Sequence, residues 1–83
     1  MMTIEEIRLA VQRLFEIAPV IHVDVSINRP RIRIEDQVAR ITGVYRNIFQ
    51  IEAEGKSYTL QYADILMGSV RISELAEDGA SAH

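Results

Sequence analysis

Five arginines lie within one stretch of the chain, and their type and spacing favour a binding function. They are Arg29, Arg31, Arg33, Arg40 and Arg46. Counted with Glu35 and Asp36, residues 29–46 have a net charge of 5 − 2 = +3, so the rest of the chain has −3 − 3 = −6. Guanidinium groups bind carboxylates and phosphates alike. Such a basic strip can attract an acidic partner, although the whole chain lacks the basic charge of a dedicated nucleic-acid binder.

The first three of these arginines alternate along a predicted strand, which would place Arg29, Arg31 and Arg33 on one side, with neighbours about 6–7 Å apart. Three interpretations of this pattern stay open. It could be a charged strand edge that resists pairing, with Pro30 assisting, a contact surface for an acidic protein, or a surface for nucleic acid. Three tyrosines could stack on bases, although their strand positions favour packing in or around the core. They are Tyr45, Tyr58 and Tyr62.

Carboxylates and one histidine are the other residues that could do chemistry. Hydrolysis by paired acids needs two carboxylates facing each other in a cleft, and the acids here fall mostly on polar faces or in turns. Asp64 follows a strand, and we expect it to cap a helical turn. His22 has only Asp24 as an obvious neighbour, which is too few ligands for a metal, and the chain has no cysteine. We therefore predict no catalytic residue, no metal site and no cofactor, and a protein that is not an enzyme.

Length and composition set the frame for these residues. The chain has 83 residues, of which 48% are hydrophobic, which is typical of one globular domain. We expect this domain to span residues 1–75 and the small, polar residues 76–83 to form a disordered tail. The N-terminus lacks the pattern of a signal peptide and no apolar run could span a bilayer, so we expect a cytoplasmic protein without membrane contact.

Residues 3–18 have the periodicity of an amphipathic helix, with apolar residues spaced by three and four. Thr3 and Glu6 form the pattern of a capping box. The period then changes to two, which is typical of strands, at residues 21–27, 31–34, 37–45, 48–54, 58–62 and 69–73. Gly43 indicates a bulge or bend, and residues 54–57 read as a hairpin turn.

These elements favour a mainly β fold. We expect a small five-stranded antiparallel Sm-like barrel preceded by one N-terminal helix, which would cover an open end of the barrel; an α+β roll is the alternative. Eleven residues are predicted to be buried: Ile7, Val11, Leu14, Ile21, Val23, Val25, Ile41, Phe49, Ile51, Leu60 and Ile65. Exposed strand edges and further apolar residues favour a homodimer or larger ring. These further residues include Val20, Val38, Ile48 and Leu66.

Two stretches in the second half match the pattern of a known family. Residues 37–52 read QVARITGVYRNIFQIE, and residues 57–72 read SYTLQYADILMGSVRI. They resemble the Veg family of small bacterial proteins, which has a strand ending in Tyr, then Phe-x-x-Glu, and a second strand ending in Tyr-Ala/Ser-Asp-Ile-Leu. The matching residues are Tyr45, Phe49, Glu52, Tyr62, Ala63, Asp64, Ile65 and Leu66. The family's Tyr-Pro-Ser turn is Tyr45-Arg46-Asn47 here, and its basic glycine-rich loop corresponds to residues 29–33, without glycines.

The resemblance implies an Sm-type small barrel without catalytic activity. It further implies a regulatory protein that influences gene expression and biofilm formation by protein–protein contact, with a transcriptional regulator as a partner. The alternative is an Sm-like barrel that binds nucleic acid.

Overall fold

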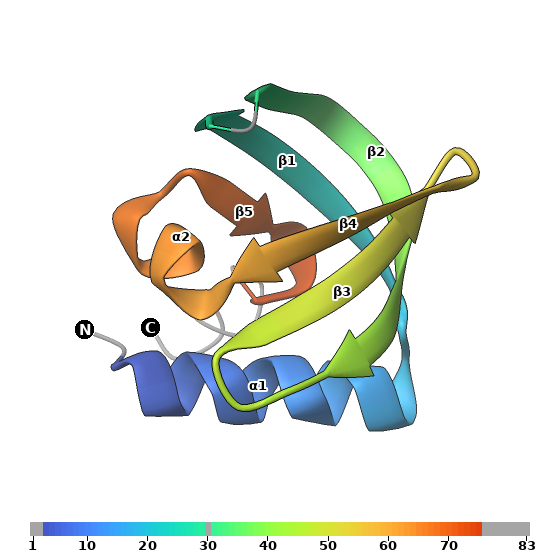
Figure 1. Ribbon diagram of the computed structural model, residues 1–83. Coiled ribbons are helices and arrows are strands. Elements are labelled where there is room, and N and C mark those ends of the chain that lie inside the picture. Colours follow the sequence, from blue (N-terminus) through green and yellow to red (C-terminus); the bar gives the residue numbers. More distant parts are fainter. Residues whose placement is uncertain (1–2, 30, 76–83) are drawn as a thin grey trace.

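The computed structural model describes residues 3–29 and 31–75 as one helix followed by a five-stranded antiparallel sheet (Figure 1). The elements are α1 (Ile4–Ile17), β1 (Val20–Asn28), β2 (Arg31–Val44), β3 (Ile48–Ala53), β4 (Lys56–Gln61), α2 (Tyr62–Met67) and β5 (Val70–Ile72). The predicted order of a helix and then five strands is confirmed. The prediction of a disordered tail at residues 76–83 and the role given to Pro30 lie outside the described residues.

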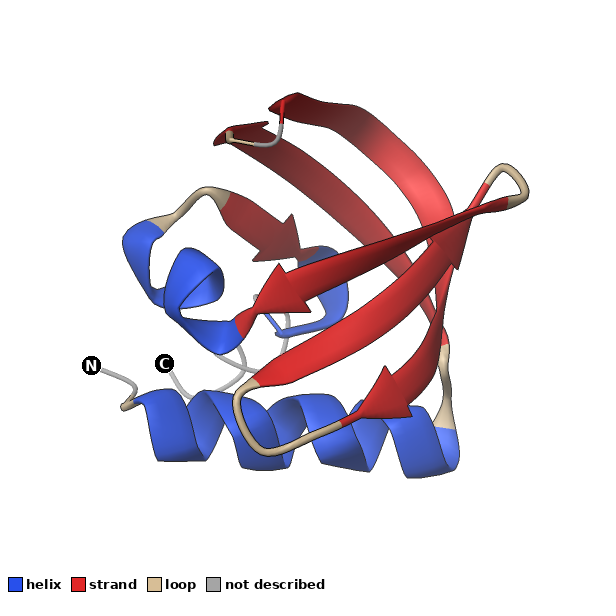
Figure 2. Ribbon diagram, in the orientation of Figure 1, coloured by secondary structure: helices blue, strands red, loops and turns tan. Residues whose placement is uncertain are grey.

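The strand order is β4-β3-β2-β1-β5, so β4 and β5 are the two edges of the sheet. All neighbouring strands are antiparallel. The sheet curls strongly, and α1 lies across one of its ends (Figure 2). Within the described residues no strand pairing joins β4 to β5, so the sheet is not closed into a barrel by hydrogen bonds.

The helix α1 begins and ends as the sequence predicts. The Thr3 hydroxyl accepts a hydrogen bond from the Glu6 amide at 3.1 Å, and the Glu6 carboxylate accepts one from the Thr3 amide at 3.0 Å. This capping box satisfies two amides that would otherwise lack a partner. Ile7 and Val11 are buried, and Pro19 follows the helix. The apolar stripe of α1 therefore faces the sheet and α2.

The predicted separation of residues 31–34 from residues 37–45 is wrong, because both segments belong to the single strand β2. The pairing of β1 with β2 shifts register opposite Asp24, which marks a β-bulge. Asp36 has a left-handed φ of 43°, and its amide donates a hydrogen bond to Asp24 Oδ1 at 2.8 Å. Aspartate tolerates this conformation better than most residues. The bulge adds one residue to β2 and so shifts the alternation of inward and outward side chains along the strand. In the sequence this shift resembles a loop between two strands.

A second register shift bends β2 near Gly43, as the sequence predicts. A Cβ on Gly43 would lie 2.8 Å from the hydroxyl oxygen and from one ring carbon of Tyr45. Only glycine therefore lets the Tyr45 ring lie directly over the backbone of β2. The two bulges together curve β2 around the core.

The turns on either side of β4 also follow the sequence. Glu54 and Gly55 both have positive φ, at 53° and 78°, in the two-residue turn between β3 and β4. Positive φ at both positions is typical of the tight turns of β-hairpins. Gly68, with φ of 87°, ends α2. The predicted capping role of Asp64 is wrong, because the N-cap of α2 is Gln61, which makes no side-chain cap hydrogen bond; Asp64 lies inside the first turn.

Nine of the eleven residues predicted as core are buried, while Leu14 and Ile65 are only half-buried beside the core. The core also contains residues that the sequence analysis left out: Ile34, Ala39, Ala53, Tyr62, Val70, Ile72 and Leu75. Tyr62 is fully buried, and its ring stacks on that of Phe49 with centroids 5.4 Å apart. The two motif residues Phe49 and Tyr62 thus form the aromatic centre of the core.

Candidate functional site

The first candidate site is the basic tip, defined as Arg29, Arg31 and Arg33 at the end of the β1–β2 hairpin. All three side chains are exposed. Arg31 pairs with Asn28 and Arg33 with Ser26, so both arginines lie on the polar face of the hairpin. Ile27 and Ile32, which oppose each other on the other face, are half-buried. The alternation therefore places Arg31 and Arg33 outward as predicted, whereas the prediction of Arg29 on the same strand is wrong, because Arg29 lies in the turn after β1.

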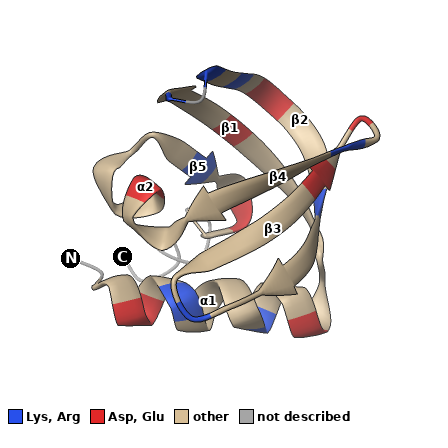
Figure 3. Cartoon of the chain, viewed as in Figure 1, with Lys and Arg blue, Asp and Glu red and all other residues tan. Residues whose placement is uncertain are grey.

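The basic tip extends beyond the strands that flank β1 and β2. Of these flanking strands, β5 pairs with β1 only at Val23–Val25, and β3 pairs with β2 only at Arg40–Val44. The prediction that the arginines lie on an edge strand is wrong for β2 as a whole, because β2 is central in the sheet. The first residues of β2, however, pair only with β1, so this end of the strand is open on its other side. Figure 3 shows the basic residues at this end of the hairpin.

The arginines of the basic tip have no salt bridge with any carboxylate of the described residues. Arg33 lines a shallow hollow of about 180 Å³ together with Asp24, Glu35 and Arg71. These carboxylates therefore lie near Arg33 without forming an ion pair within 4 Å. Guanidinium groups that remain solvated can bind a new carboxylate or phosphate without first breaking an internal salt bridge.

The other two predicted binding arginines do not join the basic tip. Arg40 lies on the outer face of the sheet, opposite Val20 on one side and Glu52 on the other. Arg46 lies in the turn between β2 and β3, beside α1. The five arginines that are close in sequence therefore occupy three separate places.

The family-motif residues have two different roles in the structure. Phe49 and Tyr62 are core residues, and Ile65 packs against the core. The remaining motif residues are exposed or half-buried: Tyr45, Glu52, Ala63, Asp64 and Leu66. The aromatic residues Phe49 and Tyr62 of the motif therefore stabilise the fold, whereas Tyr45 has an exposed ring.

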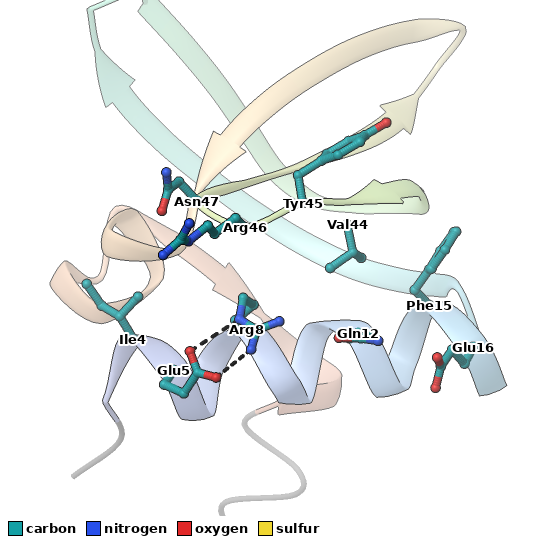
Figure 4. A pocket seen from close by; sticks show the side chains of 10 residues that line it. All are labelled: Ile4, Glu5, Arg8, Gln12, Phe15, Glu16, Val44, Tyr45, Arg46 and Asn47. Carbon is teal, nitrogen blue, oxygen red and sulfur yellow. Dashed lines mark hydrogen bonds and ion pairs between the residues drawn. The ribbon is translucent and has the colours of Figure 1, made fainter.

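The second candidate site is the helix groove, a depression of about 690 Å³ between α1 and the β2–β3 turn (Figure 4). Its lining comprises Ile4, Glu5, Arg8, Gln12, Phe15, Glu16, Val44, Tyr45, Arg46 and Asn47. Of the predicted binding residues, only Arg46 belongs to it. The sequence signal that could have found it is the width of the apolar stripe of α1, because Ile4 and Phe15 lie at its margin.

The charges of the helix groove concentrate at the N-terminal end of α1. The Arg8 guanidinium forms an ion pair with the Glu5 carboxylate, with Nε at 3.3 Å from Oε2. This hydrogen bond lowers the pKa of Glu5 and raises the pKa of Arg8. Arg46 adds a weaker attraction that lowers the pKa of Glu5 further. The Arg46 guanidinium lies above this pair in Figure 4.

A hydrogen bond from the core fixes the wall of the groove. The Tyr62 hydroxyl donates to the backbone carbonyl of Tyr45 at 2.5 Å. Burial raises the pKa of Tyr62. Tyr62 therefore stays a neutral donor, and the turn that carries Tyr45 is tied to the core.

Two residues considered for catalysis or metal binding have hydrogen-bond partners in the fold. Asp24 accepts the hydrogen bond from the Asp36 amide. His22 contacts Glu74 twice, through its backbone amide and through Nδ1, each at 2.8 Å. Among residues 3–29 and 31–75, no group of three or more His, Cys, Asp or Glu side chains could hold a metal. No helix in the described ranges is long and apolar enough to cross a membrane.

Comparisons with known proteins identify no relative. No protein-family model, no curated protein and no solved structure matches the chain. The resemblance to the Veg family therefore stays a prediction.

Proposed function

We propose that this chain is a non-catalytic regulatory protein of the cytoplasm, similar to the Veg family, that contacts an acidic protein partner. In this proposal the contact influences gene expression and biofilm formation. The observation that carries it is the basic tip, where three exposed arginines project from the end of a hairpin without a salt bridge to the described carboxylates.

Electrostatics explains why such a tip suits an acidic partner. The chain has a net charge of −3, so its surface repels most acidic proteins. A local group of three guanidiniums reverses this field at one end of the molecule. Exposed interfacial charges act mainly on the rate of encounter. We therefore assign the basic tip the role of attracting and orienting the partner.

We also propose that the curled sheet is an Sm-like small barrel left open between β4 and β5. Three features support this proposal: the strand order β4-β3-β2-β1-β5, the two bulges that bend β2, and the helix α1 across one end of the sheet. Small barrels of this type present their loops and hairpin ends as contact surfaces.

A second function, nucleic-acid binding, is favoured by one specific observation. Tyr45 is 52% exposed and lies next to Arg46, which combines a ring for stacking on bases with a cation for phosphate. Phosphate binding weakens steeply and linearly on a logarithmic salt scale. A nuclease-treated arm in the capture experiment below separates the two functions, because nuclease removes only contacts made through nucleic acid.

The test compares two triple variants with the same net charge. The tip variant carries Arg29→Gln, Arg31→Gln and Arg33→Gln. The control variant carries glutamine at three exposed cationic residues elsewhere, Arg13, Arg40 and Lys56. Both should fold, since exposed substitutions change stability by about 0.5 kcal/mol or less. In affinity capture from a nuclease-treated bacterial lysate, an acidic protein should be retained by the control variant and retained several-fold less by the tip variant. Equal retention by both would contradict the proposal.

A further inference from the structure

Three large apolar or aromatic side chains of the helix groove are exposed to solvent. Ile4 is 46% exposed, Phe15 38% and Tyr45 52%. All three line the groove, and Val44 lies between Phe15 and Tyr45 in Figure 4. Apolar side chains that line one concave surface are typical of binding sites. Covering these side chains with an apolar group is favourable, because it removes apolar surface from water.

The wall of the groove is rigid before any ligand arrives. The Tyr45 amide donates to the Ile48 carbonyl at 2.9 Å, and the Tyr45 carbonyl accepts from the Tyr62 hydroxyl. The Tyr45 ring also lies over Gly43. A turn whose backbone is already fixed by hydrogen bonds loses less freedom on binding than a free loop, which favours affinity.

One end of the groove is positively charged. Two guanidiniums, those of Arg8 and Arg46, lie there against the single carboxylate of Glu5, which Arg8 already binds. No carboxylate of the described residues lies within 4 Å of the Arg46 guanidinium. Glu16 lies at the opposite end, beside Phe15 (Figure 4). The Arg46 end is therefore complementary to a negative group on a ligand.

We propose that the helix groove binds an acidic peptide segment of a protein partner. An aromatic or leucine side chain of that segment packs between Phe15 and Tyr45, and a neighbouring carboxylate binds Arg46. This inference rests on the proposed function and deepens it, because it assigns the same acidic partner a second contact. The basic tip attracts the partner, and the groove holds one of its side chains.

The test is a titration of the ¹⁵N-labelled chain with a synthetic peptide, Asp-Asp-Phe-Asp-Asp, followed by NMR. We expect saturable shifts of amides around Phe15, Val44 and Tyr45. Arg46→Gln and Phe15→Ala should each weaken binding about five- to tenfold, because each removes one principal contact. The matched controls are Arg13→Gln and Leu9→Ala, on exposed residues of α1 outside the groove, which should bind as the parent does. The spectra also report whether each variant is folded.

Several results would overturn the inference. No saturable shift in the groove, or shifts confined to the basic tip, would do so. Preferential binding of oligouridine at Arg46 would assign the groove to nucleic acid instead. Groove shifts that depend on protein concentration without peptide would assign it to a second copy of the chain. If the peptide fails while the tip variant still loses its partner, only the groove inference falls; if the tip variant keeps its partner, the proposed function falls.

Discussion

The Tyr62 hydroxyl donates a hydrogen bond to the Tyr45 carbonyl at 2.5 Å, and this contact joins the start of α2 to the turn between β2 and β3. The Tyr62 ring is fully buried and stacks on Phe49. A side chain of the core thus fixes the backbone of a surface turn. That turn carries Arg46, so the core ties down the backbone segment from which this side chain extends.

Replacing Tyr62 with phenylalanine tests this link. The substitution keeps the ring and removes the donor, which leaves the Tyr45 carbonyl without its partner. We expect the free energy of unfolding to fall by about 1–2 kcal/mol, measured by urea denaturation. Tyr58→Phe is the matched control, because Tyr58 is only half-buried beside the core. Equal effects of both substitutions would contradict the structural role of the hydroxyl.

Phe49→Ala tests the centre of the core. Phe49 is fully buried and packs against Tyr62. We expect a loss of about 3–5 kcal/mol, as is usual when an aromatic side chain is removed from a core. Phe15→Ala removes the same group from a site that is 38% exposed, and its effect on the melting temperature should be clearly smaller. A nearly unchanged melting temperature for Phe49→Ala would contradict the core described above.

The contact between Glu74 and His22 predicts a specific pH dependence. Burial tends to raise the pKa of Glu74, but the hydrogen bonds from His22 and from the backbone outweigh it and lower the pKa. A carboxyl whose folded pKa is lowered stabilises the protein above its unfolded pKa of about 4.3, and this stabilisation is lost as the pH falls through the folded value.

We therefore expect Glu74→Gln to lower the free energy of unfolding at neutral pH. The difference in this free energy between the variant and the parent should shrink as the pH is lowered toward about 3. Urea midpoints measured across this range provide the test. Glu54→Gln, in the exposed β3–β4 turn, is the matched control for the loss of a surface carboxylate. A constant difference between the Glu74→Gln variant and the parent at every pH would show that the carboxylate charge is not involved.

Self-association is predicted from apolar residues on the outer face of the sheet. Val20 is 52% and Val38 58% exposed, and their pairing with Arg40 and His22 makes them diagonal neighbours on adjacent strands. We expect a dimer or larger assembly at micromolar concentration in sedimentation experiments, and Val38→Asp to shift it toward the monomer. Thr59→Asp, on the exposed side of β4, is the control. A monomeric parent chain would rule this surface out as a self-association site.

Local patterns allowed much of the fold to be predicted from the sequence. The capping box of Thr3 and Glu6, the period of two along the strands, and the bend at Gly43 all depend on neighbouring residues. Interactions of this kind are visible in a single sequence. The exposure of the basic tip could be predicted for the same reason, because Arg31 and Arg33 alternate with isoleucines on one strand.

Features that depend on distant residues could not be predicted. The bulge at Asp36 depends on Asp24 in the neighbouring strand, so its shift in alternation looked like a break between strands. Glu74 meets His22 across 52 positions of the chain. The helix groove combines α1 with a turn that only the folded sheet brings beside it. Such contacts arise from the curvature of the sheet, which no local spacing records.

The most direct test of the central claim is the association rate of the purified partner with the tip variant and with its charge-matched control. We predict that the tip variant associates several-fold more slowly than the control variant, because exposed charges accelerate the encounter. Added salt should slow the parent and the control variant toward the rate of the tip variant, because salt screens these charges. Dissociation rates should change little. Equal association rates for the tip and control variants at low salt would contradict the claim that the basic tip is the contact surface.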